Sequence, residues 1–274
     1  MIQNNQFTDE LNNNSELGDK QGFIIDLDGV VWKGEQIIPG CFTVIEKLKE
    51  LQKDVIFVSN NSSMSKKDVL EKLKKKGIST MLENIFNAPA VTARYIKEKH
   101  PEANVFVLGM EGLKDEIYNA GLDLSEPEQA QFLVAGYDKN LNYDSLAQGL
   151  KALLNGAKFI ATNEDGILPT NKGFLPGAGA TIGAVKGMIK EEPDVVIGKP
   201  NNIMIEMALK HFQLEPEECV FIGDTLETDI LLANKIDMSS ILVLSGNTDR
   251  EKALKSQIQA DYIFPSIADL IDYL

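Results

Sequence analysis

An α/β architecture, with largely parallel sheets and helices on their faces, is the fold class that this sequence predicts. Short β-rich runs alternate with segments of helical periodicity along almost the whole chain, which is typical of strand–helix–strand units. Polar or charged residues follow four of these runs directly. That placement is expected of a ligand-binding edge in a parallel sheet, where the carboxyl ends of the strands lie together.

We expect ten of the runs to form strands, because each is short, apolar and rich in β-branched or aromatic residues. They cover residues 22–26, 54–59, 84–87, 104–109, 131–136, 157–162, 194–197, 218–222, 240–244 and 260–263. Segments such as 44–48 and 203–209 lie between them and have the 3.6-residue periodicity of amphipathic helices.

The ten predicted strands are more than a single open sheet usually contains. The chemically suggestive residues gather near the two ends of the chain, so we expect a core domain made of residues 21–88 and 193–274. A second α/β unit is then inserted at 89–192, with Pro89 and Pro193 at the crossing points. Residues 1–20 are polar and rich in asparagine, and we expect a disordered tail there.

Composition narrows the function classes. The formal net charge of -14 disfavours extended contact with nucleic acid or with an anionic membrane. No window has the run of about 18 apolar residues that a membrane span needs. Cys41 and Cys219 form no cluster, so we expect a cytoplasmic protein without structural disulfides. His100 and His211 are the only histidines, which disfavours a histidine zinc site or a Ser-His-Asp triad.

The segment from Phe23 to Trp32 carries the strongest chemical signal. Asp26 and Asp28 stand one residue apart where an apolar strand ends, so both carboxylates can approach one point. Gly29 permits a tight turn that brings the backbone close to a ligand. Oxygen-only ligands favour a hard cation such as Mg²⁺, and one carboxylate could attack an electrophile. An EF-hand loop fits poorly, because its glycine belongs at the sixth position.

Two further strand ends carry groups suited to a phosphate. The strand at 54–59 ends in Ser59 and is followed by Asn60 and Asn61. Their hydroxyl, amide and backbone N–H groups could bind a phosphate oxyanion, although serine and asparagine are also common helix caps. Lys199 follows the strand at 194–197, where its ammonium could neutralise charge between a phosphate and carboxylates.

A fourth strand end is acidic. Asp224 follows the strand at 218–222, and Asp229 comes about one helical turn later. Acidic residues also stabilise the start of a helix through its dipole, so each motif alone is modest evidence. Because all four strand ends meet at one edge of a parallel sheet, their shared position favours a common site.

The motifs Asp-Leu-Asp-Gly-Val-Val-Trp, Val-Ser-Asn-Asn-Ser-Ser, Gly-Lys-Pro and Gly-Asp-Thr-Leu-Glu-Thr-Asp-Ile together resemble the haloacid dehalogenase superfamily of phosphatases. Their order is similar to the NagD-like branch, subfamily IIA, which includes 4-nitrophenyl phosphatases and phosphoglycolate phosphatases. The resemblance implies a Rossmann-like core with an inserted α/β cap. It also implies Mg²⁺-dependent hydrolysis of small phosphomonoesters, such as 4-nitrophenyl phosphate, phosphoglycolate, sugar phosphates or nucleotides, through an aspartyl phosphate.

The same resemblance implies roles for the acidic residues. Asp26 would be the nucleophile, and Asp28 would protonate the leaving oxygen and later deprotonate water. Mg²⁺ would be bound by Asp26, the backbone carbonyl of Asp28 and Asp224, with Asp229 in support. Phosphoryl transfer needs mainly positioning and charge stabilisation, which these groups can supply.

The remaining implied roles concern the phosphate and the cap. Ser59, Asn60, Asn61 and Lys199 would hold the phosphate, with the backbone at Gly29 close by. The cap would contact the small phosphorylated metabolite through a loop that includes Asn163 and Asp165, and a homodimer could form through this cap.

Other function classes stay open at this point. The segment from Gly177 to Gly183 has the spacing G-x-G-x-x-x-G and follows Leu175 and Pro176 rather than a clear strand, so a dinucleotide-binding oxidoreductase fits poorly. A phosphotransferase or phosphomutase could use the same aspartyl phosphate with a different acceptor. A non-catalytic protein that binds a phosphorylated metabolite is also possible on this fold.

Overall fold

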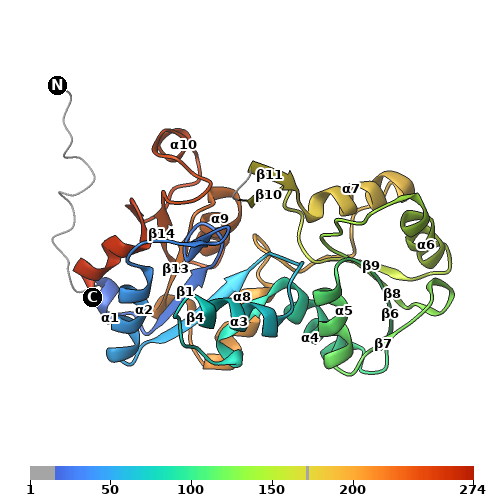
Figure 1. Cartoon of the computed structure of the whole chain (residues 1–274), viewed down its shortest axis with the longest axis horizontal. Helices are drawn as coiled ribbons and strands as arrows, with labels where there is room; N and C mark the ends of the chain where they lie inside the picture. Colours follow the sequence, from blue (N-terminus) through green and yellow to red (C-terminus); the bar gives the residue numbers. More distant parts are fainter. Residues whose placement is uncertain (1–15, 171–172) are drawn as a thin grey trace. The chain divides into compact units, whose positions relative to one another are not determined.

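The computed structural model describes residues 16–170 and 173–274, and the chain forms two compact units (Figure 1). Among the described residues, the first unit holds 16–57 and Ala208–Leu274, and the second holds those within Val58–Met207. The chain passes from the first unit to the second within β4 (Asp54–Ser59) and returns within α8 (Ile203–Phe212). The insert expected at 89–192 remains a prediction.

Parallel strands form the centre of the first unit. Their order is β15 (Tyr262–Phe264), β14 (Ser239–Val243), β13 (Cys219–Gly223), β1 (Gly22–Asp26) and then β4. Every residue of β1 and β13 is buried, which explains why these strands read as unbroken apolar runs. The helices are α1 (Glu16–Asp19), α2 (Cys41–Glu50), α9 (Leu231–Lys235) and α10 (Arg250–Lys255), with a π-helical turn at Leu226–Ile230 before α9.

The second unit has its own parallel sheet. The strand order is β12 (Val195–Val196), β9 (Lys158–Ala161), β8 (Phe132–Ala135), β6 (Asn104–Leu108) and β7 (Asp123–Leu124). Figure 1 shows α6 (Tyr143–Leu154) beside α7 (Ala178–Ile189), and α4 (Ala88–Lys99) beside α5 (Glu111–Asn119). The unit also contains α3 (Lys66–Lys75) and β5 (Ile85–Asn87).

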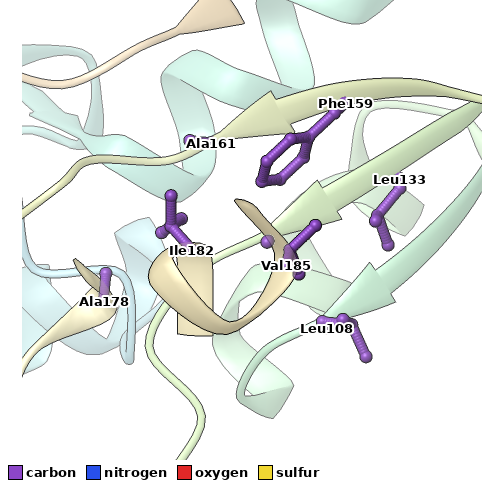
Figure 2. Close-up of a cluster of buried hydrophobic side chains, with 8 residues drawn as sticks. Leu108, Leu133, Phe159, Ala161, Ala178, Ile182 and Val185 are labelled. Atoms are coloured by element: carbon purple, nitrogen blue, oxygen red, sulfur yellow. The ribbon is translucent and has the colours of Figure 1, made fainter. Parts of the chain in front are cut away.

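A buried apolar cluster joins α7 to this second sheet (Figure 2). Ile182 and Val185 are spaced by three residues and therefore share one face of α7. They pack against strand side chains such as Leu108, Leu133 and Phe159. Burial of such side chains, each worth roughly 1.5–3 kcal/mol, fixes α7 on the sheet.

The α/β fold class with parallel sheets is confirmed, and each of the ten predicted strands overlaps an observed one. Short elements were not predicted: the hairpin of β2 (Trp32–Lys33) and β3 (Gln36–Ile37), strand β7, and the antiparallel hairpin of β10 (Ile167–Thr170) and β11 (Gly173–Pro176).

Residues 1–15 of the predicted tail lie outside the described residues, so only residues 16–20 can be compared with the structure. There, residues 16–19 are helical and Leu17 is 3% exposed, because its side chain packs into the first unit. In the part of the chain that the structure describes, no helix is both long and apolar enough to cross a bilayer.

Candidate active site

Three carboxylates meet in the first unit at the carboxyl ends of two neighbouring strands. Asp26 is the last residue of β1 and Asp224 follows β13, and the register pairs Ile25 with Ile222 just before them. One oxygen from each of Asp26, Asp224 and Asp229 lies within 4.8 Å of the others. Their exposed fractions are 6%, 2% and 1%, so the cluster is almost closed to solvent.

This cluster fits a hard divalent cation. Buried like charges at such separations are unfavourable unless protons or positive charge compensate them. The donor set consists only of carboxylate oxygens, which are the ligands that Mg²⁺ and similar cations prefer. The residues present therefore suit the cofactor that the motifs imply.

Asp229 also organises the turn that carries Asp224. Its Oδ2 accepts hydrogen bonds from the backbone N–H groups of Asp224 and Thr225, both at 3.1 Å. A Cβ atom at Gly223 would come within 2.5 Å of the Asp229 carboxylate, so only glycine leaves room for it. Asp229 thus fixes the start of the π-helical turn as well as contributing an oxygen to the cluster.

The loop after β14 closes around Asp224. The backbone N–H of Asn247 donates to Oδ2 of Asp224 at 2.6 Å, and Oγ1 of Thr225 donates to Oδ1 at 2.9 Å. A Cβ at Gly246 would lie 2.6 Å from the Cβ of Asp224 and closer still to its carboxylate. Asp224 is therefore held in one orientation by groups on both of its oxygens.

Gly29 approaches the same carboxylate from the other motif. Its φ of 92° is in the left-handed region, and a Cβ there would come within 2.6 Å of Cγ of Asp224. Its carbonyl accepts a hydrogen bond from Oγ of Ser245 at 2.6 Å. Glycine is required here for both its conformation and its size, and the role of Gly29 beside a phosphate stays a prediction.

Asp28 is not part of the three-carboxylate cluster. Its Oδ1 accepts a hydrogen bond at 2.9 Å from Nε1 of Trp32, whose side chain is 2% exposed. The backbone N–H of Gly29 donates to the carbonyl of Trp32 at 2.7 Å, which closes the turn. The buried indole therefore sets the direction of the Asp28 side chain.

The other predicted site residues belong to the second unit. Ser59 is 3% exposed, and its Oγ accepts a hydrogen bond from the N–H of Asn61 at 3.1 Å. Oδ1 of Asn61 accepts from the N–H of Ser63 at 3.0 Å and so closes a local turn. Helix α3 is capped by Ser65, so capping does not account for the polar residues at 59–61.

Asn60, Lys199 and Asp165 are linked directly, although they are far apart in the sequence. Oδ1 of Asn60 accepts from the N–H of Lys199 at 2.8 Å, and Nδ2 of Asn60 donates to the Lys199 carbonyl at 3.0 Å. Nδ2 also donates to the Asp165 carboxylate, at 3.1 Å from Oδ2. Nδ2 of Asn163 donates to the carbonyl of Asn60 at 2.7 Å.

Several residues that organise the site were not predicted from the sequence, chiefly Trp32 and the loop Ser245–Asn247. The indole could have been noticed, because Trp32 closes the same motif as Asp28. The loop carries a serine, a glycine and an asparagine after a strand, which by itself is an ordinary turn composition.

These features define an α/β protein with a buried carboxylate site at the carboxyl ends of parallel strands. Family models match both ends of the chain: one described as haloacid dehalogenase-like hydrolase over residues 23–123, and one described as HAD-hydrolase-like over residues 196–270. The chain belongs to the haloacid dehalogenase-like hydrolase family.

Individual relatives agree with this assignment over nearly the full chain. The chain is 36% identical to the sugar-phosphatase AraL of Bacillus subtilis, covering 91% of each protein. It is 34% identical to the 5'-nucleotidase YutF of the same organism, covering 93% of this chain and 98% of the relative. A solved p-nitrophenyl phosphatase from Archaeoglobus fulgidus superposes with a TM-score of 0.89 at 38% identity, covering 93% of this chain and 100% of the other.

Proposed function

We propose that this protein is a Mg²⁺-dependent phosphatase of small phosphomonoesters. The observation that carries the proposal is the buried cluster of Asp26, Asp224 and Asp229, whose oxygens lie within 4.8 Å of one another. Family membership and relatives that are named as phosphatases support the same reaction class.

In the proposed reaction, an oxygen of Asp26 attacks phosphorus, and the bond to the ester oxygen breaks as the aspartyl phosphate forms. Asp28 gives a proton to the leaving oxygen. It then takes a proton from the water that attacks the aspartyl phosphate, and inorganic phosphate is released. Trp32 supports this role, because its indole N–H already fixes one oxygen of Asp28.

Asp26, Asp224 and Asp229 would hold the cation, together with the carbonyl of Asp28. When bound, Mg²⁺ would neutralise charge on the phosphoryl oxygens and on the nucleophile. We assign Lys199 to neutralise the remaining charge, and Ser59, Asn61 and the backbone of Asn60 to bind phosphate oxygens. The side chain of Asn60 is already hydrogen-bonded to Lys199 and Asp165.

We propose sugar phosphates as the first substrates to test, with nucleoside monophosphates second. Support comes from relatives named sugar-phosphatase, acid sugar phosphatase and 5'-nucleotidase. We place the protein in the cytoplasm, a reducing compartment, because Cys41 and Cys219 are both free and buried.

The test is phosphate release from 4-nitrophenyl phosphate and from a panel of sugar and nucleoside phosphates. Each substrate is assayed with Mg²⁺, with EDTA, and with the variant Asp224→Asn. We expect metal-dependent release that is lost in the variant, with kcat/KM ranking the substrates. Folded protein that releases no phosphate with Mg²⁺ would refute the phosphatase proposal, and transfer of the phosphoryl group to an added alcohol or sugar would favour a phosphotransferase.

We also propose a homodimer that pairs α6 of one copy with α6 of another. Tyr143 and Leu154 are 90% and 78% exposed, and they share a face of this helix with Ala147 and Leu150. An antiparallel pair would match Tyr143 with Leu154 of the partner subunit. Asp144 would then lie on the same flank as Lys151 of the partner subunit, which gives opposite charges across the pair.

Light scattering over a range of protein concentrations tests the dimer. We expect a dimer for the natural protein and a monomer for Leu154→Asp, which places a charge in the apolar stripe. Leu51→Asp on the first unit, where the leucine is 39% exposed, is the matched control and should stay dimeric. A natural protein that is monomeric at every concentration would overturn this proposal.

A further inference from the structure

The side chain of Asn60 is bonded to both main-chain groups of Lys199. Its Oδ1 accepts from the Lys199 N–H at 2.8 Å, and its Nδ2 donates to the Lys199 carbonyl at 3.0 Å. Asn60 is 7% exposed and Lys199 is 3% exposed, so water does not compete freely for these groups. The two bonds together fix the backbone from which the lysine side chain extends.

The second N–H of the Asn60 amide is directed to Asp165. The distances from Nδ2 to the two carboxylate oxygens are 3.1 and 3.3 Å. The loop that carries Asp165 is also anchored by α7, because the N–H of Gly179 donates to the Asp165 carbonyl at 2.9 Å. Since a primary amide has two N–H donors, Lys199 and Asp165 use both of them.

The neighbouring residues are suited to this arrangement. A Cβ at Gly198 would lie 2.6 Å from Oδ1 of Asn60 and 2.8 Å from Cβ of Asn163, so glycine is needed beside Lys199. Asn163 holds the main chain of Asn60 through its 2.7 Å hydrogen bond, and its Oδ1 accepts from the Asp165 N–H at 3.1 Å. Only an asparagine at position 60 combines this length with both an acceptor and two donors, because aspartate lacks the donors.

We infer that Asn60 is a positioning residue that couples the loop around Asp165 to Lys199. This inference rests on the proposed function, in which Lys199 neutralises phosphoryl charge, and on the expectation that the loop with Asp165 contacts the substrate. A change at Asp165 removes one of the three hydrogen bonds that orient the Asn60 amide. The Lys199 backbone then becomes less restrained, so a change in the loop alters the chemical step as well as substrate binding.

The experiment is a double-mutant cycle of Asn60→Ala and Asp165→Ala with two readouts. The first is the hydrogen-exchange rate of the Lys199 amide measured by NMR, and the second is kcat and KM for 4-nitrophenyl phosphate with Mg²⁺. Asp165→Asn is the conservative variant, because its amide oxygen can still accept from Asn60. Asn155→Ala is the matched control, since that exposed side chain bonds only within its own helix end.

We expect Asn60→Ala to speed exchange at Lys199 and to lower kcat, each by about tenfold or more, while KM changes by less than about threefold, as the loss of buried hydrogen bonds implies. Asp165→Ala should change Lys199 exchange and kcat in the same direction in the natural background, and it should add nothing to these two effects in Asn60→Ala. Asp165→Asn should keep kcat and the Lys199 exchange rate close to their natural values. Asn155→Ala should leave both quantities unchanged.

Equal effects of Asp165→Ala in both backgrounds, or an unchanged Lys199 exchange rate in Asn60→Ala, would overturn the coupling. If Asn60→Ala does not fold, the comparison of Asp165→Ala with Asp165→Asn still decides, because Asp165 lies in a loop. The exchange readout does not depend on catalysis. A natural protein without phosphatase activity would therefore refute the proposed function and leave the coupling open to measurement.

Discussion

Replacing Gly246 with alanine should disrupt the carboxylate cluster. The added Cβ would lie 2.6 Å from Cβ of Asp224 and closer to its carboxylate, whereas non-bonded carbon atoms normally approach to about 3.5–4.0 Å. Asp224 is 2% exposed and cannot turn into solvent. Relief of the clash must therefore move the carboxylate or the loop by about 1 Å, which separates Asp224 from its hydrogen-bond donors.

The cost follows from the two bonds that would be lost. The N–H of Asn247 donates to Asp224 at 2.6 Å and Oγ1 of Thr225 at 2.9 Å. Hydrogen bonds to charged groups contribute about 1.5–3 kcal/mol each, so Gly246→Ala should cost about 3–6 kcal/mol in total. If the loss falls on cation binding, the Kd for Mg²⁺ should rise by at least about 100-fold.

Isothermal titration with Mg²⁺ and thermal unfolding measure where this cost falls. Gly187→Ala is the matched control, because a Cβ there meets nothing within 4 Å and α7 should gain about 0.5–1 kcal/mol of stability. A Gly246→Ala variant that keeps both the natural Kd for Mg²⁺ and the natural Tm would contradict this prediction.

Two further predictions concern groups beside the cluster and in the core. Trp32→Phe removes the indole N–H that donates to Asp28, so kcat should fall about tenfold, and an unchanged kcat would contradict this role. Because the smaller ring leaves a cavity at this buried position, Tm should fall as well. Burial raises the pKa of the Cys41 and Cys219 thiols from about 9 in the unfolded chain to about 12 in the folded protein. The folded state therefore favours the neutral thiols, so their contribution to the free energy of unfolding is complete below pH 9 and is lost as pH rises toward 12. Thermal unfolding from pH 8 to 11 should show this decline, with a flatter curve for Cys41→Ala with Cys219→Ala; rapid labelling of both thiols by iodoacetamide in the native protein at pH 8 would contradict it.

The sequence allowed the carboxylate cluster to be predicted because its geometry follows from sheet topology. Once β1 and β13 are parallel neighbours, Asp26 and Asp224 must emerge at the same edge, and the spacing to Asp229 fits one turn. Long strands such as β4 and β14 were predicted for a similar reason, since a buried apolar run is visible without knowing its partners.

The features that escaped prediction depend on contacts between distant residues or on very short elements. The N–H of Asn247 and the carboxylate of Asp224 are 23 residues apart, and Asn60 is 139 residues from Lys199. No local pattern specifies such pairs. Strands of two residues, such as β2 and β7, are too short to show a period, and the residues of β11 are all exposed, so burial gives no alternation there.

The most direct test of the proposed mechanism is to look for the covalent intermediate on Asp26. The protein is mixed with 4-nitrophenyl phosphate and Mg²⁺, quenched in acid within milliseconds, and analysed by mass spectrometry of its peptides. We expect one phosphoryl group, carried by the peptide that contains Asp26 and absent from Asp26→Asn and from protein treated with EDTA. Turnover by the natural protein with the phosphoryl group on another residue, or turnover retained by Asp26→Asn, would contradict it.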